Sequence, residues 1–210
     1  MVTTAVVPMV LQGRFVRLEP LTPDHVPALV AAADGPRDTY GFTWVPGDEA
    51  AARDYVETAL RWQAEGTAIP FATYSLTAGR VVGSTRFANI SYWDWPPGNP
   101  NQRGPELPDD VEIGWTWLSA DAQRTPVNSE AKLLMLTHAF ETWRVHRVNL
   151  KTDARNWRSR NAIERIGGKL DGVIRAQQPA FDGTVRDNAW FTMLASEWPA
   201  VKLRLEQKLA

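Results

Sequence analysis

The segment that most constrains the fold runs from Val111 to Thr152, where a strand pattern, a helix pattern and a second strand pattern follow one another. Residues 111–118 alternate between apolar and polar side chains, as a half-buried strand does, with Val111, Ile113, Trp115 and Trp117 expected on one face. Residues 131–143 are apolar around most of the helical circumference, which is typical of a largely buried helix. Strand, helix and strand in this order imply a right-handed crossover and a parallel pair, so residues 146–152 are expected to pair in parallel with the first strand.

Strand and helix patterns on both sides of this unit predict an α/β (α+β) fold. The first strand is followed by two helices, and Gly-containing turns join two pairs of later strands, so most of the sheet is expected to be antiparallel. The expected strands are residues 15–19, 69–76, 80–90, 111–118, 146–152, 169–177 and 185–194. One helix is expected to begin near Thr22. Further helices are expected at residues 48–65, 131–143, 156–167 and 196–209.

The 210 residues contain no Gly/Ser linker and no charge block that would divide them, so we expect one domain over residues 1–210 with its core at about 14–198. The absence of cysteine excludes disulfides, thiolate catalysis and cysteine-ligated zinc, and the three histidines show no metal-ligand spacing. No metal is therefore expected. The apolar start is broken by Pro8 and lacks basic residues, and no run reaches membrane-spanning length, so a cytoplasmic protein is predicted.

Charge is unevenly placed, although the net charge is only −1, which disfavours a nucleic-acid partner. Eight lysines and arginines lie between Arg144 and Lys169, and this stretch predicts an anionic ligand. Acidic side chains gather at residues 48–57 and 106–112, which favours a cationic substrate.

The segment from Ser91 to Asp110 contains five prolines, so it is expected to form a long loop without regular structure. Loops of this length are functional or mobile. Of the ten tryptophans, Trp93 and Trp95 in this loop are candidates for an aromatic-walled substrate pocket with Trp115 and Trp117. The alternative is ordinary packing of large amphipathic rings.

The turn from Gln123 to Asn128 precedes the buried helix, and a helix start offers unpaired N–H groups and the positive end of the dipole. Such a turn is a candidate anion site. The alternative is that Thr125 and Asn128 only cap the helix.

Taken together, the motifs resemble the GNAT superfamily of acyl-CoA-dependent N-acyltransferases over about residues 14–198, closest to the branch of the ribosomal-protein N-terminal acetyltransferases. The resemblance rests on the segments beginning at Arg14, Glu112, Asn128, His138, Arg147, Asn156 and Asp182. It implies a mixed, mostly antiparallel sheet of six to seven strands, splayed between its fourth and fifth strands. Relatives of this branch often form dimers.

The same resemblance implies that coenzyme A lies between strands 112–118 and 146–152, with its pyrophosphate on the turn before the buried helix. Many relatives have a glycine-rich turn there, whereas this chain has none, so side chains are expected to replace it. The cofactor-binding residues implied are Trp115, Thr116, Trp117, Leu118, Gln123, Arg124, Thr125, Asn128, Asn156 and Ser159.

Catalysis by thioester aminolysis needs a neutral amine, oxyanion stabilisation and a proton for the leaving thiolate. Glu112 resembles the glutamate that deprotonates the amine, and Ser159 resembles the serine that contacts the thiol. Backbone N–H groups freed by a bulge near residues 115–118 would polarise the carbonyl. The alternatives are an exposed strand carboxylate for Glu112 and a first-turn helix residue for Ser159; His138 is expected to be a core histidine.

These observations predict an N-acetyltransferase that moves an acetyl group from acetyl-CoA to a primary amine by direct attack. The amine is a small molecule or a peptide N-terminus, bound near Trp93, Trp95 and Glu112. One alternative is a non-catalytic CoA-binding sensor or scaffold. A second is a transferase that uses aminoacyl-tRNA, whose binding would weaken steeply with salt.

Overall fold

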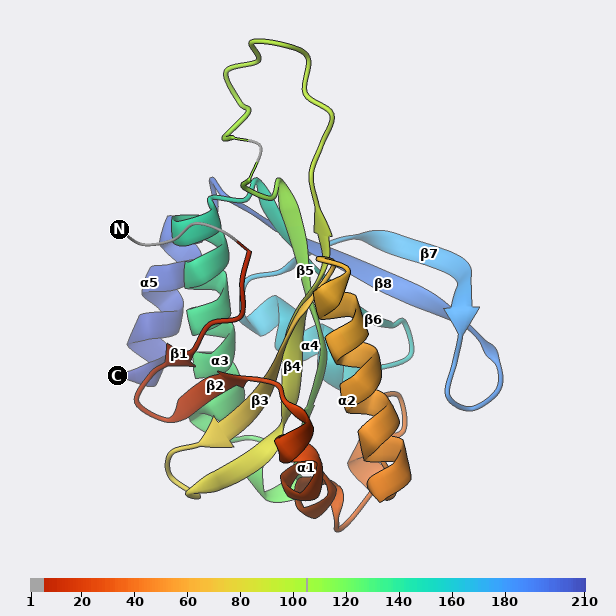
Figure 1. The fold of residues 1–210 in the computed structure, drawn as a ribbon. Helices are drawn as coiled ribbons and strands as arrows, with labels where there is room; N and C mark the ends of the chain where they lie inside the picture. Colours follow the sequence, from red (N-terminus) through yellow and green to blue (C-terminus); the bar gives the residue numbers. More distant parts are fainter. Residues whose placement is uncertain (1–5, 105) are drawn as a thin grey trace.

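A single mixed sheet runs through the computed structural model, which describes residues 6–104 and 106–210 (Figure 1). Its strand order is β1-β2-β3-β4-β5-β6-β8-β7, in which β5 and β6 are parallel and every other neighbouring pair is antiparallel. The strands are β1 (Leu11–Gln12), β2 (Val16–Pro20), β3 (Ile69–Ser75), β4 (Arg80–Ser91), β5 (Asp110–Leu118), β6 (Arg147–Asp153), β7 (Lys169–Pro179) and β8 (Val185–Leu194). The predicted mixed, mostly antiparallel sheet is confirmed.

Helices cover both faces of the sheet (Figure 1). The helices α1 (Val26–Ala33) and α2 (Glu49–Ala64) pack on one face over a cluster that includes Leu29 and Val56. The helices α3 (Pro126–Thr137), α4 (Trp157–Arg165) and α5 (Trp198–Leu209) contribute to the larger cluster around Phe87 and Met135. None of the helices in the described ranges is long and apolar enough to span a membrane.

The sheet has eight strands within the described residues, one more than the six to seven expected. The additional strand is β1, whose Leu11 pairs with Leu18 of β2. A segment of two residues is too short to show a periodicity in the sequence, so only its pairing with β2 in the structure identifies it as a strand.

The buried helix begins earlier than predicted, at Pro126 in place of Ala131. Thr125 is its N-cap and Pro126 occupies the first helical position, where the missing N–H of proline costs nothing. After Thr137 the chain continues as a π-helix through residues 138–143 and stops at Arg144, whose φ is +60°.

A β-bulge in β5 changes the faces of two predicted core residues. Ser84 pairs with Trp117 and Arg86 with Gly114, so two residues of β5 stand opposite Thr85 of β4. Trp115 has a φ of +49°, and the extra residue reverses the alternation after it. The prediction that Trp115 and Trp117 share the face of Val111 and Ile113 is therefore wrong: Trp117 packs in the cluster of α1 and α2.

Candidate active site

The strands β5 and β6 pair only at their beginnings and then separate. The ladder joins Asp110 to Arg147, Val111 to Val148 and Glu112 to Asn149, while β5 continues to Leu118. The predicted splay between the fourth and fifth strands of the expected sheet is thus confirmed, and the edge of β5 beyond Glu112 has no partner strand on this side among the described residues. A cavity of about 680 Å³ lies at the divergence.

This cavity is lined by the residues that the sequence assigned to cofactor and catalysis. They come from the end of β5, the turn before α3 and the start of α4, which are distant in sequence. The predicted residues that line it are Glu112, Trp115, Thr116, Trp117, Leu118, Gln123, Arg124, Thr125, Asn128, Asn156 and Ser159.

Glu112 lines the cavity but is only 2% exposed, so the alternative of an exposed strand carboxylate is wrong. Its Oε2 accepts a hydrogen bond from Asn89 Nδ2 at 2.8 Å and lies 3.0 Å from the ammonium nitrogen of Lys151. Oε1 has no hydrogen-bond donor among the described residues, and a Cβ at Gly114 would lie 3.0 Å from it. The carboxylate is therefore oriented through one oxygen, and the other is available to a ligand.

The turn before α3 makes its bend without glycine. Arg124 has a φ of +62°, the left-handed conformation that glycine adopts at no steric cost. Thr125 Oγ1 donates to the carbonyl of Ala122 at 2.7 Å and accepts from Val127 N at 3.4 Å, so its capping role is confirmed. The Gln123 amide donates to Leu118 O and Thr39 Oγ1, whereas Asn128 Oδ1 is buried without a donor in the described ranges.

The start of α4 also contributes to the lining of the cavity. Asn156 is the N-cap, and its Oδ1 accepts a hydrogen bond from Ser159 N at 3.1 Å. Both residues line the cavity, so capping and ligand contact are compatible. Ser159 therefore has a fixed position in the first turn of a helix.

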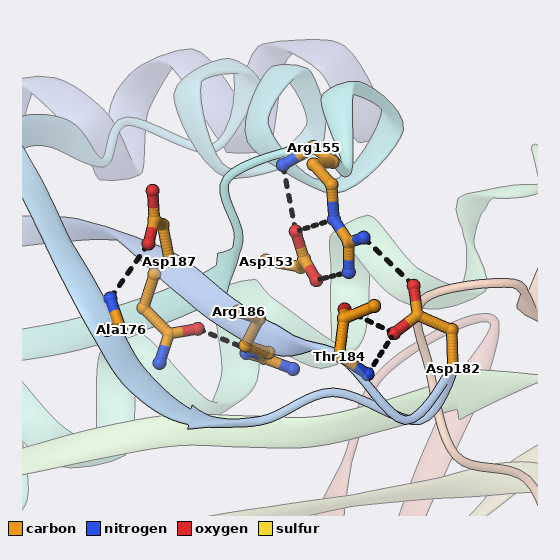
Figure 2. A network of polar contacts seen from close by, with 8 residues as sticks. Asp153, Arg155, Ala176, Asp182, Thr184, Arg186 and Asp187 are labelled. Carbon is orange, nitrogen blue, oxygen red and sulfur yellow. Dashed lines mark hydrogen bonds and ion pairs between the residues drawn. The ribbon is translucent and has the colours of Figure 1, made fainter.

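A polar network connects this helix start to the β7–β8 hairpin (Figure 2). Arg155 donates two bonds to buried Asp153, at 3.0 Å from Nε and 2.7 Å from Nη2, and a third to Asp182 at 2.9 Å. Thr184 completes the turn by donating to Asp182. The hydrogen bond from Arg155 lowers the pKa of Asp153 below its usual range. The hairpin tip, which includes Phe181, is thereby held at the cavity.

Three buried cations line the cavity, Lys132, Arg86 and Arg186, and no sequence feature marked the first two. Lys132 of α3 is 4% exposed and donates to Thr85 Oγ1 at 2.9 Å and Thr116 Oγ1 at 2.6 Å. Burial lowers the pKa of its ammonium group to about 7. Arg86 of β4 is 1% exposed. Each lies in a segment with an ordinary strand or helix pattern, so no sequence signal marked them.

Several predicted features lie away from the cavity. Trp93 and Trp95 do not line it; their indole nitrogens donate to Asp110 and Asp109 at the base of the long loop, which projects from the body of the molecule (Figure 1). His138 packs against Phe87 and Trp143, and burial lowers its pKa.

The basic stretch does not form one anion-binding surface. Four of its members pair with carboxylates, whereas Arg158 and Arg165 line the cavity. The paired ones are Arg147, Lys151, Arg155 and Lys169.

Comparison with protein families gives the cavity its context. Residues 16–169 match the family model of the acetyltransferase (GNAT) domain. This chain belongs to the GNAT acetyltransferase family. It is accordingly an acetyl-CoA-dependent acyltransferase. None of the curated proteins compared with this GNAT acetyltransferase matches it.

Solved structures share its fold over nearly the whole chain. A GCN5-related N-acetyltransferase from Brucella melitensis is 27% identical, with a TM-score of 0.82 over 97% of this chain and 86% of that one. A protein from T. thermophilus that bears the provisional name of an acetyltransferase is 34% identical, with a TM-score of 0.77 over 97% and 98%. RimJ from Mycobacterium smegmatis, solved with CoA-disulfide, is 18% identical and shares the fold with a TM-score of 0.77 over 97% and 96%.

The cavity of this GNAT acetyltransferase has the chemistry to hold coenzyme A. Arg124, Arg158 and Arg165 supply positive charge to the lining of the cavity. The first turn of α3 supplies unpaired N–H groups, and the buried Asn128 side chain has a free acceptor oxygen. These groups suit a phosphate-bearing ligand with amide groups in its arm.

Proposed function

We propose that this GNAT acetyltransferase transfers the acetyl group of acetyl-CoA to a primary amine by direct attack, without a covalent enzyme intermediate. The observation that carries the proposal is the position of Glu112: a buried carboxylate at the point where β5 and β6 separate, with Oε2 held and Oε1 free. Bound acetyl-CoA would supply an activated thioester carbonyl.

Glu112 is assigned the role of proton acceptor. As the amine nitrogen forms its bond to the carbonyl carbon, its excess proton passes to Oε1, directly or through a water. Lys151 and Asn89 fix the carboxylate through Oε2, so the accepting oxygen keeps its orientation. A positioned acid or base contributes about 10²–10⁴ to the rate.

Two further groups serve the carbonyl oxygen and the leaving sulfur. The bulge at residues 115–116 leaves one residue of β5 outside the ladder with β4. The N–H group of that residue is free to donate to the developing oxyanion. Ser159, which lines the same cavity, donates the proton of its Oγ to the departing thiolate as the carbon–sulfur bond breaks. The proton balance is closed by transfer from the amine to Glu112 and from Ser159 to sulfur, with solvent restoring both groups.

Calorimetric titration with acetyl-CoA, followed by thiol release across a panel of amines, tests this function. Binding and amine-dependent thiol release are expected. Binding without release for any amine, together with tolerance of substitutions at Glu112 and Ser159, would favour a CoA-binding sensor. Salt-sensitive binding of aminoacyl-tRNA would favour the third alternative, which the pairing of four basic residues with carboxylates disfavours.

The acceptor of this proposal is a small-molecule amine or a peptide N-terminus, as expected from the sequence. The cytoplasmic location and the single domain stay predictions. A homodimer also remains part of the proposal, supported by the apolar side chains that β7 exposes. These are Leu170, Val173 and Ile174.

A further inference from the structure

Arg86 is a buried cation without a counter-ion in the described parts of the chain. Its side chain lines the active-site cavity, and Nε and Nη2 have no hydrogen-bond acceptor there. No ion pair joins it to a carboxylate of residues 6–104 or 106–210. Because burying an unpaired charge is costly, a ligand that pairs with it would gain a strong charge-assisted contact.

Three aromatic rings surround this guanidinium. Its central carbon lies 4.7 Å from the ring centroid of Tyr55, 5.3 Å from that of Trp62 and 5.3 Å from that of Trp115. Stacking on ring faces compensates part of the desolvation of the cation. Rings accept no hydrogen bonds in the guanidinium plane, so the buried Nε and Nη2 remain without an acceptor, and a planar anion such as a carboxylate would satisfy both.

The strand register places Arg86 beside Glu112. Arg86 stands opposite Gly114 and Ala88 stands opposite Glu112, so the two charged side chains share one face of neighbouring strands. Diagonal neighbours of this kind lie about 7–8 Å apart at the backbone. Both side chains line the same cavity, so a buried guanidinium without an acceptor lies close to a carboxylate oxygen without a donor.

We propose that the acceptor amine carries a carboxylate close to its amino group, as a free α- or β-amino acid does. Arg86 binds that carboxylate, and Glu112 Oε1 faces the amine. This inference rests on the proposed amine acetylation and narrows its acceptor. It replaces the purely cationic acceptor expected from the acidic segments, and it disfavours a peptide N-terminus whose carboxylate is distant.

The first test uses wild-type protein and matched substrate pairs. Thiol release is measured with each L-amino acid and β-alanine and with the corresponding C-terminal amides. A preference for the acids of about 100-fold or more in kcat/KM is expected. Equal or better turnover of the amides would overturn the proposal. So would a panel in which no acid gives thiol release or thermally stabilises the acetyl-CoA-loaded protein.

The second test uses Arg86→Met and Arg86→Lys. The KM of the best acid should rise about 100-fold in Arg86→Met and less in Arg86→Lys, so that the preference for the acid over its amide is lost in Arg86→Met and partly kept in Arg86→Lys. Arg80→Met is the matched control, because Arg80 lies on the same strand, outside the cavity, in an exposed pair with Asp121. If Arg86→Met does not fold, the proposal is tested by the wild-type comparison of acids with amides alone.

Measuring the affinity for acetyl-CoA distinguishes failure of this inference from failure of the proposed function. It should be the same in wild type and Arg86→Met; a weakened affinity would place a cofactor phosphate on Arg86 and overturn the proposal. If wild type acetylates only amines without a carboxylate, the proposed function survives and this inference does not. If acetyl-CoA does not bind at all, the proposed function itself fails.

Discussion

The ammonium nitrogen of Lys132 lies 2.6 Å from Thr116 Oγ1, so the buried helix α3 contacts the bulge of β5 directly. Thr116 Oγ1 also lies 2.7 Å from Thr85 Oγ1 on β4. Lys132 donates a hydrogen bond to each of these two hydroxyl oxygens. The side chain thus joins three elements at the position where β4 and β5 lose their regular register. Its charge state is expected to influence both stability and the geometry of the bulge.

Lys132→Met should remove a pH dependence of stability. The pKa of Lys132 is about 7 when folded and 10.5 for an ordinary lysine, so the unfolded chain binds more protons between these values. The free energy of unfolding of wild type should therefore rise between pH 7 and about 10.5, by up to about 1.4 kcal/mol per pH unit, and the burial cost is fully present below pH 7. Urea unfolding at several pH values measures it.

The control for this experiment is Lys202→Met, which removes a lysine from an exposed pair with Glu141. Its stability should follow the wild-type slope. Parallel curves for wild type and Lys132→Met would show that the ammonium group does not titrate in this range.

Glu130→Gln should destabilise the fold. Its buried carboxylate accepts backbone N–H bonds from Arg14, Phe15 and Val16 at 2.8, 2.6 and 2.8 Å, and a Cβ at Gly13 would lie 2.4 Å from its carboxyl carbon. An amide would present a donor to these donors, so a loss of about 2–4 kcal/mol is expected in urea unfolding. Glu141→Gln, at an exposed carboxylate, is the comparison; equal losses would refute the anchoring role.

Glu112→Gln should lower kcat/KM by about 10²–10⁴ and leave acetyl-CoA affinity unchanged. The amide keeps the shape of the side chain but cannot accept the amine proton. Thiol-release kinetics and calorimetry measure the two quantities. Glu57→Gln, on an exposed site of α2 outside the cavity, should behave as wild type. Full activity of Glu112→Gln would assign deprotonation to another group.

Arg124→Gly should be more stable than Arg124→Ala by about 1 kcal/mol, because only glycine adopts the φ of +62° without a steric cost. Both variants lose the guanidinium, so both should bind acetyl-CoA more weakly than wild type and to the same extent. Thermal unfolding and calorimetric titration separate the backbone effect from the charge effect. If Arg124→Gly alone kept wild-type affinity, the guanidinium would have no role in binding.

Local patterns predicted most of the elements because a strand or helix that buries one face repeats that face along the sequence. The parallel pairing of β5 with β6 followed from the strand, helix, strand order, and the cap at Thr125 followed from its residue type. The early start of α3 at Pro126 was missed, although its capping residue was recognised. The two-residue strand β1 has no periodicity from which it could be predicted.

The amino-acid sequence by itself determined the order of the elements, the cavity residues on β5, the α3 turn and α4, and the resemblance to the GNAT family. Only the tertiary structure decided that Trp117 turns to the α2 side, that Trp93 and Trp95 lie outside the cavity, and that Lys132 and Arg86 are buried cations beside it. The physical reason is that burial, register and counter-ion pairing depend on contacts between distant segments, such as Arg86 with Tyr55 and Trp115. A local pattern records which side chains repeat, whereas the charge environment of a site arises when the strands and helices pack together.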